Sequence, residues 1–290
     1  MNRKDFRFLE PLRVRWCEVD MQKIVFNGHY LMYFDTAVAG YWRALALPYH
    51  DTMEQLQGDL YVRKATLEYL GSARYDERLH VGIRCERVGN SSMVFAAAVF
   101  RGEQCLVHGE LLYVFADPAT QTSRPVPQAL RDVLDAYEAG ERMVEVRLGT
   151  WAEHGVAAQA IRQAVFAVEQ GIAADLIADQ ADDADAGAVH ALAFNRLGAA
   201  LASGRFLSPS HGAGAAQIGR MATAATVRDA GLGSAVLQAL IEAARQRGDR
   251  ELRLNAQTGA VDFYRRAGFE PHGAVFEQAG VQHQAMRRTL

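Results

Sequence analysis

Cysteine and long apolar runs are both scarce in this 290-residue sequence. The three cysteines, Cys17, Cys85 and Cys105, argue by number and spacing against a disulfide framework and against a Cys-x-x-Cys site. Apolar runs such as Val94–Phe100 are far shorter than the ~18 residues of a membrane helix, and charges throughout Met1–Glu10 leave no signal-peptide core. We therefore predict a cytoplasmic protein with reduced thiols and no membrane partner.

A surplus of basic charge is also missing. The formal net charge is −3, and acidic and basic residues nearly balance on both sides of Gly140. Nothing in this balance predicts a nucleic acid as partner. Lys4, Lys23 and Lys64 are the only lysines among 31 basic residues, which we interpret as a genomic base-composition effect. Half of the residues are hydrophobic, which is ordinary for a globular protein, and the length suits two domains of roughly 140 residues.

The residue pattern changes near Gly140. Before it, periodicity predicts one long apolar helix at 30–45 and a set of strands typical of an antiparallel α+β domain. The predicted strands are 12–19, 60–69, 78–87, 91–100 and 104–116. After it, strands and helices alternate, which favours an α/β domain; its clearest helix is 232–247. We therefore predict domains at 1–140 and 141–290.

The strongest local signal is the hexapeptide Arg228–Gly233 (RDAGLG), which lies between a predicted strand and a predicted helix. Glycines allow the backbone to approach an anion closely, and the free N–H groups of a helix start bind phosphate. A pyrophosphate would fit over Gly231, Gly233 and Ser234, and Arg228 would add charge-assisted hydrogen bonds. An ordinary glycine-containing turn is the alternative interpretation.

Two further segments give this loop a family context, Ile218–Thr223 (IGRMAT) and Tyr264–Phe269 (YRRAGF). With them, residues 142–290 resemble the GNAT acetyltransferase superfamily, and Val165–Ile172 and Ala279–His283 make the ElaA-type branch most similar. The resemblance implies an α/β fold with a mixed sheet and a cleft between two splayed strands. It also implies direct transfer from acetyl-CoA to a small-molecule or peptide amine, with no metal ion.

The resemblance also implies roles for individual residues. Tyr264 would protonate the departing thiolate, with a buried core aromatic as the alternative. Glu169 and His283 are candidates for the acceptor amine or its proton, with a surface glutamate and a structural histidine as alternatives. The implied coenzyme A contacts are Met221, Ala222 and Thr223 for the pantetheine arm, Arg228, Ala230, Gly231, Leu232, Gly233 and Ser234 for the pyrophosphate, and Asn255 and Tyr264.

The N-terminal signal is Arg13–Asp20 (RVRWCEVD) followed by Ile24–Leu31 (IVFNGHYL). This pattern resembles the 4-hydroxybenzoyl-CoA thioesterase family of the hot-dog fold, with an antiparallel sheet around a long helix. The resemblance implies that Asp20 is the catalytic base or nucleophile and that a backbone N–H near Asn27 polarises the thioester carbonyl. Lys23 departs from the usual glycine, and Asn27 from the frequent histidine or tyrosine. A turn aspartate and a capping asparagine are the alternatives.

Together these resemblances predict a bifunctional enzyme that uses coenzyme A twice. One alternative is that only one domain is catalytic and the other binds acyl-CoA or mediates dimerisation; another is a protein with a purely structural or interaction role. The hot-dog resemblance implies a homodimer or homotetramer with acyl-CoA at the subunit interface. We also expect loops at Tyr49–Gly58 and Leu207–Ala216 to shape the two pockets.

Overall fold

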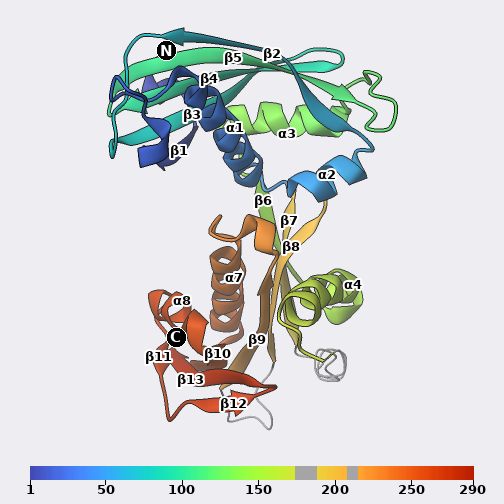
Figure 1. Cartoon of the computed structure of the whole chain (residues 1–290). Helices are drawn as coiled ribbons and strands as arrows, with labels where there is room; N and C mark the ends of the chain where they lie inside the picture. The colour runs from blue at the N-terminus through green and yellow to red at the C-terminus, as the bar shows by residue number, and fades with distance from the viewer. Residues whose placement is uncertain (174–187, 208–214) are drawn as a thin grey trace. The chain divides into compact units, whose positions relative to one another are not determined.

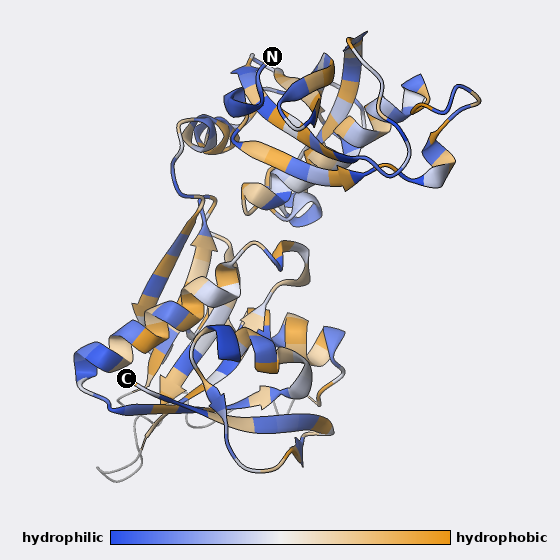
Figure 2. Ribbon diagram, turned by 90° about the vertical axis from the view of Figure 1, so that its left-hand side faces the viewer, coloured by the Kyte–Doolittle hydropathy of each residue, from blue (hydrophilic) through white to orange (hydrophobic). Residues whose placement is uncertain are grey.

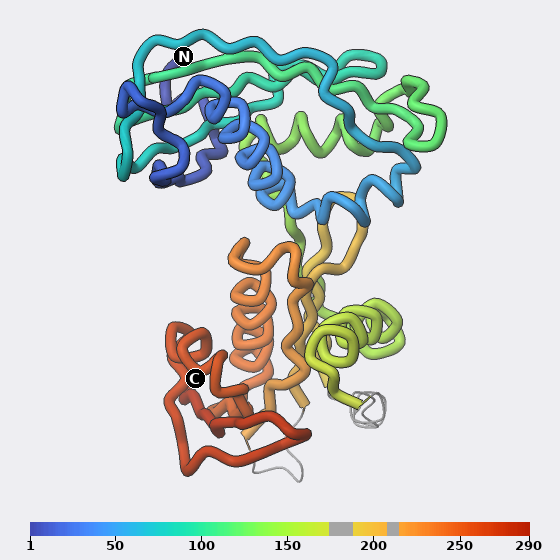
Figure 3. The backbone as a smooth tube through the Cα atoms, viewed as in Figure 1, coloured from blue at the N-terminus to red at the C-terminus, as the bar shows by residue number. Residues whose placement is uncertain are grey.

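The computed structural model describes residues 1–173, 188–207 and 215–290. The chain forms two compact units, Met1–Met143 and Val144–Leu290. Each unit is continuous in sequence, so the backbone trace is blue to green in the first and yellow-green to red in the second (Figure 3). The domain limits 1–140 and 141–290 stay a prediction. No helix in the described ranges combines the length and the apolar character that crossing a membrane requires.

The N-terminal unit is an antiparallel sheet with a long helix, as predicted for a hot-dog fold (Figure 1). The sheet order is β1-β3-β4-β5-β2, so β1 and β2 are the edge strands. The elements are η1 (Arg3–Asp5), β1 (Phe8–Arg13), η2 (Trp16–Glu18), α1 (Asn27–Ala44), α2 (Tyr49–Gln55), β2 (Asp59–Tyr69), β3 (Arg78–Val88), β4 (Ser92–Arg101), β5 (Gln104–Ala116) and α3 (Gln128–Glu138).

The core of this unit lies between the sheet and its two long helices. Residues at helical spacing along α1, including Tyr30, Phe34 and Tyr41, are buried, which is why this segment forms an amphipathic helix. The Tyr41 ring packs edge-on against Phe95 of β4 and Tyr137 of α3, with centroid distances of 5.7 and 5.2 Å. Helices α1 and α3 therefore cover the same face of the sheet (Figure 1).

Two local predictions for this unit are wrong. The strand expected at 12–19 ends at Arg13, and Trp16–Glu18 is a 3-10 turn instead. The reason is the Glu18 carboxylate, which accepts the Arg15 backbone N–H at 2.7 Å and closes the turn. The loop expected at Tyr49–Gly58 contains α2, whose N-cap is Pro48.

The C-terminal unit is a mixed sheet with helices on both faces, in the order β11-β13-β10-β9-β8-β7-β6, with β12 paired to β13. The predicted mixed-sheet α/β fold is therefore confirmed. Its elements are β6 (Val144–Gly149), α4 (Trp151–Arg162), the π-helix η3 (Gln163–Glu169), β7 (Val189–Asn195), β8 (Ala200–Leu207), β9 (Ala216–Thr223), η4 (Ala225–Val227), α7 (Leu232–Arg247), β10 (Glu251–Gln257), η5 (Thr258–Ala260), α8 (Val261–Arg266), β11 (Glu270–Pro271), β12 (Phe276–Gln278) and β13 (Val281–Thr289).

Helices α4 and α7 cover opposite faces of this sheet (Figure 1). On the α4 face, Ala222 of β9 packs with Ile161 and Val165. On the other face, Gly204 of β8 leaves room for Val236 and Leu240 of α7. Coloured by hydropathy, the helices and strands show alternating apolar and polar segments, as expected of elements with one buried face (Figure 2).

Strands β9 and β10 are the one parallel pair in the described ladders, and α7 connects them. They are in register only at Leu252↔Ala216 and Arg253↔Gln217. Beyond these positions each strand stays paired on its other side, through Thr223↔Ala202 for β9 and Gln257↔His283 for β10. The two strands therefore diverge, and their facing backbone edges form an open wedge, which we call the β9–β10 wedge.

Candidate active sites

Asp20 lies in a tight hairpin between β1 and α1. The hairpin is held by the bridge Val19↔Val25 and by a 2.9 Å hydrogen bond from the Asp20 N–H to the Ile24 carbonyl. Oδ1 of Asp20 accepts the Gln22 N–H at 2.8 Å. Within the described residues, Oδ2 accepts no hydrogen bond, so half of the carboxylate is available to a ligand. The hairpin turns Asp20 back beside the segment that leads into α1.

Glu18 anchors the first strand of this hairpin and is almost fully buried. Burial alone would raise the pKa of its carboxyl, but hydrogen bonds from the Arg15 N–H, the Tyr33 hydroxyl and the Arg15 guanidinium outweigh burial and hold the pKa below its usual range. Its backbone carbonyl accepts the Phe26 N–H at 2.9 Å. Glu18 therefore fixes the position of the hairpin against α1 and has no oxygen free for catalysis.

Lys23 occupies the turn of the hairpin in a left-handed conformation, with φ of +62°. This conformation explains why the resembling family usually has glycine here, because a side chain costs about 1 kcal/mol in the left-handed region. We expect Lys23→Gly to stabilise the protein by roughly 0.5–1 kcal/mol, measured as a higher denaturant midpoint. Gln22→Gly is the matched control, since φ of Gln22 is not positive and the substitution only adds unfolded-state entropy. An unchanged or lower midpoint for Lys23→Gly would contradict the strain argument.

Helix α1 begins at Asn27 directly after the hairpin. The His29 N–H bonds the Phe26 carbonyl, while the Asn27 and Gly28 N–H groups contact no acceptor in the described parts of the chain. Free N–H groups at a helix start carry the positive end of the helix dipole. The Tyr69 hydroxyl donates to the Asn27 carbonyl at 3.2 Å and ties the helix start to the edge strand β2. Asp20 and Asn27 therefore lie at the two ends of the short segment that joins the hairpin to α1.

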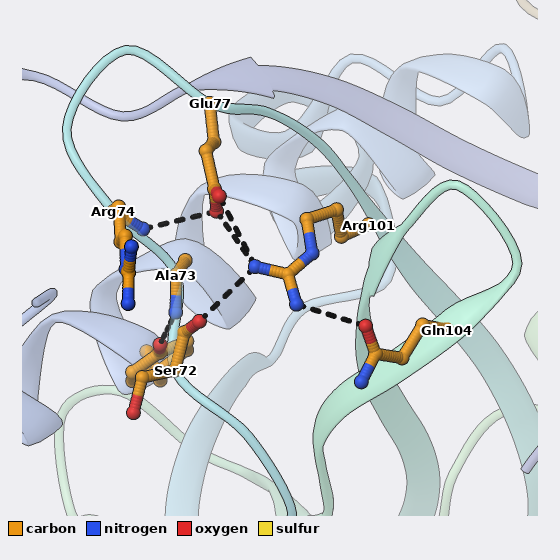
Figure 4. Close-up of polar contacts among 7 residues, drawn as sticks. Ser72, Ala73, Arg74, Glu77, Arg101 and Gln104 are labelled. Carbon is orange, nitrogen blue, oxygen red and sulfur yellow. Dashed lines mark hydrogen bonds and ion pairs between the residues drawn. The ribbon is translucent and has the colours of Figure 1, made fainter.

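The loop between β2 and β3 supports this helix start, a role that the sequence did not indicate (Figure 4). The Ala73 N–H bonds the Tyr30 hydroxyl at 2.9 Å, and the Ala73 carbonyl accepts the Val25 N–H at 2.9 Å. Arg101, at the end of β4, donates to Glu77 at 3.1 and 3.2 Å and to the Ser72 carbonyl at 3.4 Å. These contacts join residues far apart in sequence, so no local motif could predict them.

The loop Arg228–Gly233 lies between β9 and the start of α7, as predicted. Asp229 and Gly231 have left-handed φ values of +64° and +82°, and Gly231 is the N-cap of α7. A Cβ on Gly233 would lie 3.2 Å from Thr223 Oγ1 and 3.7 Å from the Phe263 ring, so the α7 start, the β9 end and α8 converge there. Successive N–H groups of such a loop and helix start form an anion-binding concavity.

Arg228 and Glu169, assigned to different roles from the sequence, contact each other in the structure. The Arg228 guanidinium forms a two-pronged ion pair with the Glu169 carboxylate, with N–O distances of 2.6 and 2.5 Å. Its Nε donates to the Thr223 carbonyl at 3.2 Å. The hydrogen bond to Arg228 lowers the pKa of Glu169, and the same contact raises the pKa of Arg228. The arginine expected to bind pyrophosphate thus has a carboxylate partner already.

The remaining predicted residues lie around the β9–β10 wedge. Met221 and Ala222 direct their side chains into the two faces of the core, which leaves the β9 backbone as the part available to a ligand. Beside Arg220, whose φ is +53°, the ladder to β8 slips by one residue and β9 has a bulge. Asn255 is exposed and donates to Gln278 at 3.3 Å. Ala230 and Ser234 are exposed and Leu232 is buried.

Tyr264 and His283 complete this set. Tyr264 is only 8% exposed, between Phe263 and Phe269, and burial raises the pKa of its hydroxyl to about 12. His283 stacks on Phe276, and its Nδ1 is 2.8 Å from the Val281 carbonyl. His283 pairs with Gln257, whose amide donates to Gln170 at 3.0 Å. The predicted loop Leu207–Ala216 lies mostly outside the described residues.

Comparison with known proteins assigns each unit separately. Residues 22–108 match the family model described as the thioesterase superfamily, and residues 206–290 match the acetyltransferase (GNAT) domain. The first unit is similar to an acyl-CoA thioester hydrolase, YbgC, of Escherichia coli, with 28% identity over 135 residues, 45% of this chain and 96% of that protein. Acyl-CoA thioesterase YbgC of Haemophilus influenzae is 26% identical over 97 residues, 33% of this chain and 71% of that protein.

Among solved structures, an acyl-CoA N-acyltransferase from Pseudomonas aeruginosa is 28% identical, with a TM-score of 0.45, and covers 50% of this chain and 99% of its own. The two family models match separate stretches, one in each unit. Because each match agrees with the sheet found in its unit, the chain is a fusion of a thioesterase-superfamily domain of the hot-dog fold with a GNAT acetyltransferase domain.

Proposed function

We propose that the chain is a bifunctional coenzyme A enzyme. Its N-terminal unit hydrolyses acyl-CoA thioesters, and its C-terminal unit transfers acetyl from acetyl-CoA to a small-molecule or peptide amine. The observation that carries the proposal is the loop Arg228–Gly233, a glycine-containing helix start beside the β9–β10 wedge whose N–H groups would bind phosphate. The Asp20 hairpin next to the start of α1 supports the hydrolytic half.

For hydrolysis, the thioester carbonyl would accept the N–H groups at Asn27 and Gly28, where the helix dipole stabilises a developing oxyanion. Asp20 would act through the oxygen that its turn leaves free, either attacking the carbonyl carbon or removing a proton from the attacking water. The C–S bond then breaks and coenzyme A leaves as the thiol. Glu18 and the Arg101–Glu77 contacts hold both groups in place.

For transfer, the α7 start would bind the pyrophosphate and the unpaired β9 edge would bind the amides of the pantetheine arm. Backbone groups of β9 near the bulge, where its ladder to β8 shifts register, would polarise the thioester carbonyl. The amine attacks the acetyl carbon directly. Tyr264 gives its proton to the departing thiolate, and the amine loses its own proton to a nearby base.

An acyl-CoA panel tests both halves at once, with free thiol release as the readout. Without amine, we expect aromatic or long-chain acyl-CoA to be hydrolysed at least about tenfold faster than acetyl-CoA, because rapid acetyl-CoA hydrolysis would deprive the second unit of its donor. Phe26 and Tyr69, both about half exposed beside Asn27, offer apolar surface for such a chain. An effective amine should then increase acetyl-CoA consumption. Equal hydrolysis of acetyl-CoA and larger thioesters would contradict this division of substrates.

We also propose that the chain forms a homodimer or homotetramer through the N-terminal unit. The edge strand β2 exposes Val62 and Tyr69, at 54% and 52%, and exposed apolar edges favour pairing with a second copy. Light scattering should give two or four times the 31.9 kDa chain mass. Val62→Lys should weaken the assembly, whereas Val156→Lys, at an 89% exposed position of the other unit, should not. A monomer at micromolar concentration would contradict the proposal.

A further inference from the structure

The C-terminal end of the π-helix η3 contacts both sides of the open end of the β9–β10 wedge. Val165 anchors this segment by packing on Ala222 of β9. From its last turn, Glu169 reaches Arg228 beyond the end of β9, and the neighbouring Gln170 accepts the Gln257 amide at the end of β10 at 3.0 Å. Two successive side chains therefore contact the loop that follows β9 and the end of β10, and we call Glu169–Gln170 the strap.

In the contact between the strap and Arg228, the Glu169 carboxylate occupies the position in which the guanidinium could bind another anion. A carboxylate that bonds both terminal nitrogens of a guanidinium presents two oxygens, as a phosphate does. The third contact, from Nε to the Thr223 carbonyl, holds the guanidinium at the end of β9 independently of Glu169. Arg228 can therefore exchange one anion for another without leaving its place.

Charge argues against simultaneous occupation by both anions. A pyrophosphate that bonds the Arg228 guanidinium would approach the Glu169 carboxylate, because that carboxylate already bonds both terminal nitrogens. Like charges a few ångströms apart repel strongly where solvent is partly excluded. Asp229 adds a further negative charge next to Arg228. Both side chains of the ion pair remain 40% exposed, so Glu169 has water to move into.

We propose that Glu169 is an internal competitor of the coenzyme A pyrophosphate for Arg228, so that donor binding opens the strap. This inference rests on the proposed binding of coenzyme A by the C-terminal unit. The competing model is that Glu169 only orients Arg228 toward the pyrophosphate. The two models predict opposite changes in affinity when the Glu169 charge is removed.

Calorimetric titration of the full chain with coenzyme A separates these models. We expect Glu169→Gln to bind coenzyme A about three- to fivefold more tightly than the wild type, the range that a partly exposed ion pair supports. Glu145→Gln is the matched control, because Glu145 forms a similar exposed pair with Arg147 on β6. The affinity of this variant for coenzyme A should equal that of the wild type. Unchanged or weaker binding by a folded Glu169→Gln overturns the competition.

Two further titrations identify which part of coenzyme A and which residue account for the higher affinity of Glu169→Gln. Pantetheine lacks the pyrophosphate, so Glu169→Gln should leave its affinity unchanged; a parallel gain for pantetheine overturns the exchange. In an Arg228→Gln background, Glu169→Gln should change coenzyme A affinity less than in the wild type, and an equal gain would also overturn it. Failure of the wild type to bind coenzyme A would refute the proposed transferase function as well, whereas binding that ignores Glu169→Gln refutes the competition alone.

Discussion

Asp20→Asn is expected to lower acyl-CoA hydrolysis by about 10³-fold and to leave acetyl transfer to an amine unchanged. Loss of a nucleophile or general base costs roughly 10² to 10⁴ in rate. The substitution suits the structure because asparagine keeps the oxygen that accepts the Gln22 N–H, so the hairpin is retained and only the charge is lost. Initial rates of thiol release, with and without amine, measure both activities in one preparation.

Asp35→Asn is the matched control for this experiment. Asp35 is exposed on α1, about two turns from the helix start, so the substitution removes one carboxylate charge from the same unit but away from the Asp20 hairpin. Its hydrolysis rate should stay within about twofold of the wild type. If Asp20→Asn and Asp35→Asn hydrolyse alike, Asp20 is a turn residue and the hydrolytic assignment fails. Loss of both activities in Asp20→Asn would instead point to damage outside the hairpin.

The contrast between α7 and the Asp20 hairpin illustrates how far sequence reasoning reaches. The bounds of α7, Leu232–Arg247, match the prediction because glycines mark both ends, with left-handed φ values of +82° at Gly231 and +91° at Gly248. Such boundaries are local and follow from the residues themselves. The turn at Trp16–Glu18 was predicted as strand, because its alternation looked regular. The buried Glu18 side chain overrides that pattern, through contacts that periodicity does not encode.

The site residues also divide into those that the local sequence predicts and those that depend on tertiary packing. The glycine loop could be predicted because its chemistry depends on neighbours in sequence. The ion pair between Glu169 and Arg228 joins residues 59 positions apart, and it appears only when η3 packs on β9. The support that Arg101 gives the α1 start is likewise a product of tertiary packing. The sequence thus identified candidate ligand-binding groups, and the structure identified the side chains that contact them.

Tyr264→Phe is expected to lower kcat for acetyl transfer by about 10²-fold, with little change in KM for acetyl-CoA and none in hydrolysis by the first unit. The phenol contributes a proton only when the thiolate departs, so its loss affects the transition state rather than binding. Burial raises the pKa of Tyr264 to about 12. The hydroxyl therefore keeps its proton through neutral and mildly alkaline pH, and deprotonation of Tyr264 should not reduce the wild-type rate below about pH 11.

The variant Phe269→Leu distinguishes proton donation by the Tyr264 hydroxyl from a contribution of the Tyr264 ring to core packing. Phe269 contacts the Tyr264 ring at a centroid distance of 6.1 Å, so the variant loosens the same apolar cluster without removing a proton donor. We expect it to lower stability by about 1 kcal/mol and to retain most of kcat. Thermal unfolding and steady-state kinetics on both variants distinguish the outcomes. If Tyr264→Phe behaves like Phe269→Leu, with lowered stability and near-normal kcat, the hydroxyl is not the acid. Since Tyr264 is the only tyrosine after Gly140, the proton would then have to come from another group at the β9–β10 wedge.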